Sequence, residues 1–264
     1  MAQNRKLQEF YESIYKKGED SYFSKFESGK DKSENEHIVL KHLGNINGKF
    51  VIDVGCGTGS LSYKMAEAGA AKSIGIDYSP TAIETANNLH QHARLSYLNI
   101  DFKDLEVKAD VIVSCGTFEH LDNPLEMMKK MSSMLSHKGT LILTCPHFYN
   151  IRGIIWISLQ KLFNIPMSLT DVHSISPADM IKWSIQSGLT LVETESYDYD
   201  RANGMWMILD MKKRLTNALR DAGLSQSGVE SLLNWAEDYI HYNQQSLNPN
   251  HFDGATCLYK FTKI

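Results

Sequence analysis

The segment from Phe50 to Gly59 combines a short apolar run with three closely spaced glycines. Its sequence is Phe-Val-Ile-Asp-Val-Gly-Cys-Gly-Thr-Gly, so Asp53 lies inside the apolar run and the glycines occupy positions 55, 57 and 59. Apolar, β-branched residues predict a buried strand, and the glycines predict a tight turn into a helix. Glycine reaches unusual φ/ψ values and lets a ligand approach the main chain. We therefore expect this turn to bind a ligand through its backbone.

The spacing of the glycines separates this turn from two common nucleotide-binding motifs. Dinucleotide sites use G-x-G-x-x-G to set a pyrophosphate on a helix N-terminus, and P-loops add Gly-Lys-Ser/Thr for phosphate and magnesium. Neither pattern follows Phe50. The turn therefore predicts a different class of ligand.

The glycine pattern resembles a known cofactor loop once the next strand is included. Asp-x-Gly-x-Gly-x-Gly, led by Asp53 and followed by Asp77 at the end of the next predicted strand, resembles the S-adenosylmethionine loop of the class I methyltransferases. The resemblance implies that the loop binds the methionine portion and that Asp77 binds both ribose hydroxyls. A carboxylate suits that role because it only accepts hydrogen bonds and can take two hydroxyl protons at once. Without the acid, the glycines would equally fit an ordinary tight turn.

A second corner of the resemblance is Asp101-Phe102, which follows the predicted strand 95–100. In the family this corner holds the adenine. The carboxylate accepts a hydrogen bond from the exocyclic amine, and the backbone N–H of the next residue meets a ring nitrogen. Because aspartate also favours turns for its own reasons, a loop role for Asp101 stays open.

A third corner follows the predicted strand 109–114 and reads Cys-Gly-Thr-Phe-Glu-His-Leu from residue 115. It matches the family's segment after the fourth strand, where a residue near Gly116 contacts the cofactor and a histidine at the position of His120 lies close by. The cofactor site that the resemblance implies comprises Tyr22, Asp53, Gly55, Cys56, Gly57, Gly59, Asp77, Tyr78, Asp101, Phe102, Cys115, Gly116, Thr117 and His120.

The N-terminal residues 5–17 carry apolar side chains at helical spacing, which predicts a helix with one apolar face. Phe10 and Ile14 fit best as core residues. Tyrosines nearby are either core residues or, as in the N-terminal segments of similar proteins, side chains that close over the cofactor. The ring of a tyrosine suits a half-wet pocket rim because it is amphipathic. The candidates are Tyr11, Tyr15 and Tyr22.

Strands and helices are expected to alternate along most of the chain. Strands are predicted at residues 50–54, 72–76, 95–100, 109–114, 140–144, 189–194 and 256–262, and helices at 5–17, 34–43, 60–68, 80–92, 125–135, 176–187, 205–219 and 229–242. This alternation predicts an α/β fold with a parallel sheet and helices on both faces. The resemblance implies seven strands, mostly parallel with the last antiparallel, and a helical cap completes the expected fold.

The predicted connections bring the chemistry to one edge of the sheet. Right-handed crossovers put the loops after the first four strands at the same edge, so one pocket is implied. We divide the chain into an N-terminal helix and cofactor-closing segment, a methyltransferase core with a cap loop, a helical lid insertion and a final core strand. These parts are residues 1–33, 34–196 with the cap loop at 146–175, 197–254 and 255–264. The resemblance covers about residues 34–195 and the last strand.

Methyl transfer is an in-line displacement at a sulfonium, so the protein mostly supplies alignment. A general base is needed only when the nucleophile must lose a proton early, as an alcohol or phenol does. His147 and His173 are the catalytic candidates, because the topology puts them over the pocket mouth and histidine titrates in a useful range. Each is also open to a purely structural role as a hydrogen-bonded histidine.

No metal site is expected. Asp171 and His173 lie two residues apart, but no run shows the ligand spacing of a preformed metal site. Three cysteines end strands at the active edge, where thiolates could bind a soft metalloid, although small buried cysteines are common. They are Cys56, Cys115 and Cys145.

The amino-acid composition indicates which kinds of partner and which cell compartment to expect for this protein. The 264 residues include 27 basic and 31 acidic residues, for a net charge of −4, whereas a nucleic-acid-binding domain usually has a basic face. The N-terminus lacks the apolar core of a signal peptide, and no apolar run approaches the length of a membrane span. The four cysteines lack CxxC spacing and suit reduced thiols. We expect a cytoplasmic protein that binds neither nucleic acid nor membrane.

The acceptor is expected to be a small molecule, methylated at oxygen or nitrogen. The Asn/Asp-Pro-Pro-aromatic tetrad of amino-methylating nucleic-acid enzymes is missing after residue 114. Two alternatives stay open. The chain could methylate a protein or RNA that docks on residues 197–254, or it could be a silent S-adenosylmethionine-binding module. The same insertion could also form a homodimer.

Overall fold

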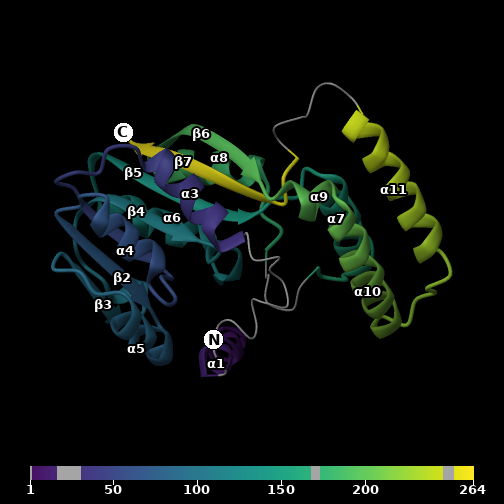
Figure 1. Ribbon diagram of the computed structural model, residues 1–264, viewed down its shortest axis with the longest axis horizontal. Coiled ribbons are helices and arrows are strands. Elements are labelled where there is room, and N and C mark those ends of the chain that lie inside the picture. The colour runs from purple at the N-terminus through teal and green to yellow at the C-terminus, as the bar shows by residue number, and fades with distance from the viewer. Residues whose placement is uncertain (1, 17–30, 168–172, 246–252) are drawn as a thin grey trace. The chain divides into compact units, whose positions relative to one another are not determined.

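The computed structural model describes residues 2–16, 31–167, 173–245 and 253–264 (Figure 1). One seven-stranded sheet has the strand order β3-β2-β1-β4-β5-β7-β6. Six strands are parallel and the last is antiparallel, as predicted. The strands are β1 (Phe50–Val54), β2 (Lys72–Asp77), β3 (Leu95–Asn99), β4 (Ala109–Cys115), β5 (Leu135–Pro146), β6 (Leu189–Tyr197) and β7 (Thr256–Lys263).

Helices connect and flank these strands. They are α1 (Ala2–Lys16), α3 (Asp31–Leu43), α4 (Ser60–Glu67), α5 (Pro80–Leu89), α6 (Pro124–Met134), α7 (Ile151–Phe163), α8 (Pro177–Gln186), α9 (Tyr199–Asn203), α10 (Met205–Asp221) and α11 (Val229–Gln245). Two short 3-10 helices, η1 (Phe102–Asp104) and η2 (Phe118–His120), follow β3 and β4.

The strand order reverses between β1 and β4. From β1 the chain moves outward to β2 and β3, and then returns to pair β4 with the other side of β1. Asp53 lies at this switch, paired with Gly75 of β2 and Val113 of β4. In open α/β sheets, ligands bind at the carboxyl ends of the strands beside such a switch point.

Local sequence explains where the helices near this edge begin. Ser79 caps α5 by accepting a hydrogen bond from the N–H of Ala82 at 3.1 Å, and Pro80 occupies the first helical position. Asn123 caps α6 in the same way, accepting from Glu126 at 3.2 Å. Short polar side chains favour the cap because they bond N–H groups that the first turn leaves unpaired. Helix α5 therefore starts just beyond the end of β2, whereas α6 starts after the loop and η2 that follow β4.

Two stretches differ from the sequence prediction. The fifth strand, predicted at residues 140–144, begins earlier, because residues 137–139 already lie inside β5, whose pairing with β4 shifts register between Ala109 and Val111. Lys138 has a φ of 61°, so the chain bends there but resumes the same strand.

The expected cap loop at 146–175 contains helix α7. Asn150 caps this helix by accepting from the N–H of Gly153 at 2.7 Å. Its apolar residues lie on more than one face, since Trp156 is buried while Ile154 and Leu162 are exposed. A helix with apolar residues on several faces shows no clear 3.6-residue period, which is why periodicity missed it.

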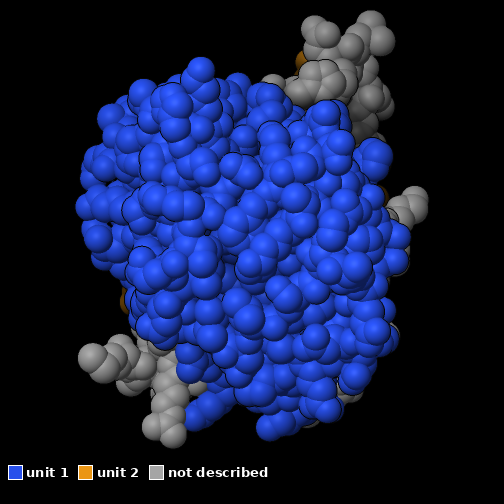
Figure 2. All heavy atoms as spheres, turned by 90° about the vertical axis from the view of Figure 1, so that its left-hand side faces the viewer, with its two compact units in different colours: residues 1–145, 178–194, 258–264 blue, residues 146–177, 195–257 orange. Residues whose placement is uncertain are grey.

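The chain divides into two compact units, coloured in Figure 2, where the face in view is mostly unit 1. Unit 1 is residues 1–145, 178–194 and 258–264, and unit 2 is residues 146–177 and 195–257. Unit 2 has a core of its own from α7, α10 and α11, formed by Ile151, Trp156, Met207, Ile208, Met211, Leu215, Val229, Leu233, Ala236 and Ile240. In the part of the chain that the structure describes, no helix is both long and apolar enough to cross a bilayer.

We predict that Gly153→Ala destabilises the protein by about 1 to 3 kcal/mol, the usual cost of overpacking. An added Cβ would lie 2.4 Å from the Cα of Phe148 and 2.6 Å from its carbonyl carbon. These are backbone atoms that cannot rotate away. Gly228→Ala is the matched control, because nothing lies within 4 Å of its added Cβ. Denaturant unfolding of both variants checks this, and equal stabilities would contradict it.

Candidate functional site

The glycine turn after β1 is tied to the end of β2. The N–H groups of Gly55 and Cys56 both donate to the carbonyl of Ile76, at 2.8 and 3.0 Å. The glycines at 55, 57 and 59 have φ values of 77°, 52° and 85°, a region that residues with a Cβ rarely adopt. The turn therefore depends on glycine for its conformation.

The same glycines leave room for neighbouring side chains. A Cβ on Gly55 would lie 2.3 Å from Oγ1 of Thr117, and a Cβ on Gly59 would lie 2.4 Å from the hydroxyl of Tyr97. Tyr97 also donates its hydroxyl to the carbonyl of Gly59 at 3.0 Å. The loops after β1 and β4 thus lie against each other, as expected from the topology.

Asp77 holds the glycine turn and the start of α5 together. One carboxylate oxygen accepts from the N–H of Gly57 at 3.1 Å, and the other accepts from the N–H of Ser79 at 2.9 Å. Burial raises the pKa of this carboxyl, while these hydrogen bonds favour its ionised form. An ionised carboxylate has about four lone-pair sites, so acceptor capacity remains for the hydroxyls of a ligand.

Asp53 lies beneath the turn as a buried carboxyl group, with 2% of its surface exposed. Ser62 of α4 donates its hydroxyl to this carboxyl at 2.6 Å. Burial, with smaller contributions from Asp77 and Glu36, raises the pKa of Asp53 from 3.8 to about 7, and the Ser62 hydrogen bond opposes the rise. Burial therefore favours the protonated form of Asp53 far more than in an exposed aspartate.

The loop after β4 is fixed by β5. The N–H of Gly116 lies 3.0 Å from the carbonyl oxygen of Thr144 and 3.2 Å from its hydroxyl. Thr117 donates its hydroxyl to the carbonyl of Cys115 at 3.2 Å. Gly116 and Thr117 are thus held at the same sheet edge as the glycine turn.

In the corner after β3, Asp101 stabilises the local turn. Asp101 caps η1 by accepting from the N–H of Lys103 at 2.9 Å. Phe102 is buried. The loop role left open for Asp101 is therefore present in the structure, and its contact with adenine stays a prediction.

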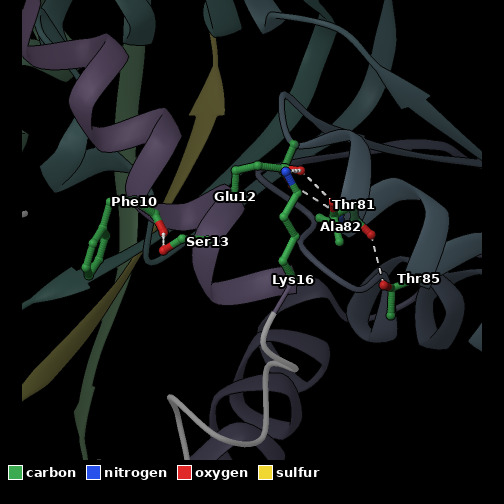
Figure 3. A network of polar contacts seen from close by, with 8 residues as sticks. Phe10, Glu12, Ser13, Lys16, Thr81, Ala82 and Thr85 are labelled. Atoms are coloured by element: carbon green, nitrogen blue, oxygen red, sulfur yellow. Dashed lines mark hydrogen bonds and ion pairs between the residues drawn. The ribbon is translucent and has the colours of Figure 1, made fainter.

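Helix α1 lies across the loops that follow β1, β2 and β4. The Tyr11 hydroxyl is 2.9 Å from Nε2 of His120, and the Tyr15 hydroxyl is 3.1 Å from the position of a Cβ on Gly57. Figure 3 shows Glu12 of α1 reaching Thr81 at the first turn of α5. Ser79 also donates its hydroxyl to the Glu12 carboxylate. These contacts connect α1 to the loops after β1, β2 and β4, all of which belong to the predicted cofactor site.

The predictions for the apolar and aromatic residues near the N-terminus are confirmed only in part. Ile14 is buried as expected, but Phe10 is 38% exposed and is not a core residue. Phe10 lies on the same helix face as Ile14 but about one turn nearer the N-terminus, where its ring meets that of Tyr11 edge-on at 5.6 Å between centroids. Tyr22 lies outside the described residues.

Several residues of this edge were not found from sequence. Glu12, Ser62 and Tyr97 each form one of the contacts above, yet none belongs to a recognisable motif. Tyr97 was visible only as one residue of an alternating strand. A motif search cannot find them because their partners are brought close only by folding.

The cysteines at this edge are thiols. Burial raises the pKa of Cys56 and of Cys115, and the nearby Asp53 carboxyl adds to both shifts. Burial also raises the pKa of Tyr78, with Asp77 contributing. All three groups are therefore protonated at neutral pH. Among the described residues, no group of three or more His, Cys, Asp or Glu side chains could hold a metal ion.

The two catalytic candidates both belong to unit 2. His147 is buried, its backbone N–H donates to the carbonyl of Ala255 at 2.7 Å, and its ring centroid is 5.5 Å from that of Tyr149. His173 is half-buried. Their catalytic roles stay predictions.

Comparison with protein families decides the class. The family model described as "Methyltransferase domain" matches residues 46–223, about two thirds of the chain. The chain belongs to this family. The predicted class I, S-adenosylmethionine-dependent methyltransferase is thereby confirmed at the level of family and fold.

The proteins that this methyltransferase resembles in sequence or in structure carry names that imply different methyl acceptors. It is 29% identical over 166 residues to a ubiquinone biosynthesis O-methyltransferase of Coxiella burnetii, covering 58% of this chain and 69% of that protein. It is 25% identical over 244 residues to "Probable protein arginine N-methyltransferase 6" of Arabidopsis thaliana, covering 89% and 49%. Magnesium protoporphyrin IX methyltransferase from Synechocystis PCC 6803, solved with bound SAH, shares the fold. Its TM-score is 0.60 at 16% identity over 98% of this chain and 100% of that chain.

We predict that Asp53 makes the protein less stable as pH rises from about 4 to 7. Its folded pKa of about 7 lies above the ordinary 3.8, so within this window the folded state holds a proton that the unfolded state has released. Asp53→Asn should remove this part of the slope. It should also be more stable than the wild type at pH 7 by about 1 to 4 kcal/mol, since one pKa unit equals about 1.4 kcal/mol.

Denaturant unfolding without cofactor at several pH values between 4.5 and 7.5 measures this slope. Asp104→Asn, at an exposed position, is the control and should keep the wild-type slope. An Asp53→Asn protein with an unchanged slope would show that burial does not shift this carboxyl.

Proposed function

We propose that this methyltransferase transfers the methyl group of S-adenosylmethionine to an oxygen or nitrogen atom of a small-molecule acceptor. The observation that carries the proposal is the position of Asp77. Its carboxylate lies between the N–H groups of Gly57 and Ser79, beside a turn whose three glycines all have positive φ. That arrangement combines a side-chain-free backbone surface with an acceptor for a diol.

The residues present fit this cofactor. The backbone of the turn at 55–59 would bind the methionine portion, and Asp77 would accept the two ribose hydroxyls. Asp101 would accept from the adenine amine while the N–H of Phe102 donates to the ring. Gly116, Thr117 and His120 complete the site, together with Tyr11 and Tyr15 of α1, which lie against His120 and Gly57.

Methyl transfer requires little of the protein beyond aligning the methyl donor with the acceptor. The sulfonium of the bound cofactor supplies a methyl group with its own leaving group. Side chains of this chain orient the donor and the acceptor for in-line attack, and orientation alone lowers the barrier substantially. We propose His147 and His173 as the groups that take the proton of a hydroxyl acceptor, since histidine changes charge near neutral pH.

Two observations support a small acceptor. The net charge of −4 is unlike the basic surface of a nucleic-acid-binding protein. The Coxiella burnetii relative carries the name of an enzyme of ubiquinone biosynthesis, and a quinone precursor is a small molecule. The proposal places the protein in the cytoplasm, where the protonated thiols of Cys56 and Cys115 would stay reduced.

A macromolecular acceptor is the second candidate. The Arabidopsis thaliana relative aligns over 89% of this chain and carries the name of a protein arginine methyltransferase. In that case residues 197–254 would be a docking surface for a protein. In the small-molecule case the same residues would form a lid or a homodimer contact.

The test is transfer of labelled methyl groups. Methyl-labelled S-adenosylmethionine is incubated with cell extract and either the wild type or Asp77→Ala, and label is separated into small-molecule, protein and RNA fractions. Label in the small-molecule fraction that is lost in the variant supports the proposal. Label in protein or RNA would promote the second candidate, and cofactor binding without any transfer would indicate a silent binding module.

For Asp77→Ala we expect cofactor affinity to fall by about 1.5 to 3 kcal/mol, the scale of hydrogen bonds to a charged group. Calorimetric titration of the cofactor measures the loss. Because Asp77 also holds Gly57 and Ser79, thermal unfolding of the variant must show that it is folded at the titration temperature. A folded variant with wild-type affinity would rule out the ribose role.

For His147→Ala and His173→Ala we expect slower turnover with unchanged cofactor affinity if the two side chains act as bases. General base catalysis typically contributes about 100-fold or more. Turnover is measured with the product identified by labelling, and affinity by calorimetry. A variant that loses fold and activity together would mark that histidine as structural.

A further inference from the structure

The carboxylate of Glu12 attaches helix α1 to the start of α5. Each of its oxygens accepts a hydrogen bond from a different hydroxyl, Oε2 from Ser79 and Oε1 from Thr81 at 2.5 Å (Figure 3). Lys16, one turn further along α1, lies 3.5 Å from Oε1. The Glu12 side chain is 23% exposed and that of Lys16 is 66% exposed. The two hydrogen bonds to α5 are therefore better shielded from water than the ion pair with Lys16.

The start of α5 is a favourable place for this carboxylate. The first turn of a helix has N–H groups without helical partners and carries a partial positive charge. Ser79 has two partners there, since its hydroxyl accepts from the N–H of Ala82 at 3.1 Å and donates to Glu12. Burial by itself raises the pKa of the Glu12 carboxyl, but the two hydroxyl donors and Lys16 outweigh it and lower this pKa below the ordinary 4.5. Glu12 is therefore ionised at neutral pH.

Ser79 also connects Glu12 with the carboxylate proposed to bind the ribose. The N–H of Ser79 donates to Oδ1 of Asp77 at 2.9 Å, and Oδ2 of Asp77 accepts from Gly57 at 3.1 Å. Burial is the main cause of the raised pKa of Asp77, and the charge of Glu12 adds to the rise, so the two carboxylates are near neighbours. A single residue thus joins the carboxylate on α1 to the cofactor site.

Two tyrosines beside Glu12 contact other loops of the site. The Tyr11 hydroxyl lies 2.9 Å from Nε2 of His120, in η2 after β4. The Tyr15 hydroxyl lies 3.1 Å from the position that a Cβ on Gly57 would take. Residues four apart lie one above the other on a helix, so the two tyrosines share a strip of α1. The attachment of Glu12 therefore also fixes where both tyrosine rings lie.

We propose that Glu12 is a positioning residue of the cofactor site, which holds α1 against α5 and thereby keeps Tyr11 and Tyr15 over the bound cofactor. This inference rests on the function proposed above. Glu12 acts through α1 and has no contact with the cofactor of its own. Loss of its two hydrogen bonds frees α1 to move away from the site. The glycine turn and Asp77 keep their own hydrogen bonds, so binding persists but the cofactor leaves faster.

The attachment of α1 is tested first on the full chain without cofactor. Hydrogen–deuterium exchange of the backbone amides of α1 is compared between the wild type, Glu12→Ala and Glu84→Ala. Glu84 is the matched control because it is an exposed glutamate on α5. We expect exchange in α1 to be about tenfold faster in Glu12→Ala, since hydrogen bonds to a charged group are among the stronger ones, and unchanged in the control. Equal exchange in all three proteins would overturn the proposal.

The positioning role is tested by the rate at which S-adenosylmethionine dissociates, measured by stopped-flow displacement. In Glu12→Ala the dissociation rate should rise about tenfold, and calorimetry should show a matching loss of affinity. Glu84→Ala should behave as the wild type. A purely structural role for Glu12 predicts faster exchange in α1 with no change in the dissociation rate, and that result would overturn the positioning role.

Two milder substitutions show whether the effect depends on this contact. Glu12→Gln keeps one acceptor oxygen and removes the charge, so its dissociation rate should lie between those of the wild type and Glu12→Ala. Thr81→Val removes one donor hydroxyl at nearly constant volume and should also accelerate dissociation. Adding Thr81→Val to Glu12→Ala should have little further effect, because the shared contact is already lost. Fully additive effects of the two substitutions would contradict the proposal.

Failure of this inference is distinguishable from failure of the proposed function. A wild type that binds no S-adenosylmethionine would overturn the proposed function, and the role of Glu12 at this site with it. A wild type that binds the cofactor and has the same dissociation rate as Glu12→Ala would overturn the role of Glu12 alone. Thermal unfolding should show that Glu12→Ala is folded at the assay temperature. If it is not, Glu12→Gln and Thr81→Val decide the outcome by the same measurements.

Discussion

The candidate site depends on one carboxylate, that of Asp77, which accepts hydrogen bonds from the N–H groups of Gly57 and Ser79. These two groups belong to the turn after β1 and to the start of α5, so a single side chain sets the distance between them. The glycines permit the turn, but they do not specify its position. Asp77 specifies the position of the turn because each of its oxygens already accepts a hydrogen bond from a backbone N–H group before a ligand binds. The binding site is therefore preorganised.

Around this carboxylate the protein tolerates unfavourable electrostatics. Asp53 lies buried under the same turn with a pKa raised to about 7, and Asp77 contributes to that rise. Two neighbouring acids in one buried place repel each other when both are ionised. A cofactor with a positive charge would relieve this repulsion, which agrees with a sulfonium donor. Helix α1, through Glu12 and Tyr11, adds contacts to the same edge from outside the sheet.

Unit 2 has a core and charged side chains of its own. Its core is apolar and built from α7, α10 and α11, and it also contains ion pairs such as Arg214 with Asp210 and Arg201 with Asp198. A buried ion cluster is seldom retained for stability, since desolvation offsets most of the attraction.

The sequence by itself determined the parts that rest on local chemistry. Glycines at alternate positions, Asp77 at a strand end, the Ser79-Pro80 helix start and the alternating strands all act within a few residues, so spacing alone predicts them. Only the tertiary structure decided the rest. Glu12 contacts Ser79, which lies 67 residues away in the sequence. Helix α7 shows no clear helical period because it has apolar residues on several faces. Arg152 contacts Asp210 only when α7 and α10 pack together. Such pairs depend on long-range packing, and no local pattern in the chain encodes them.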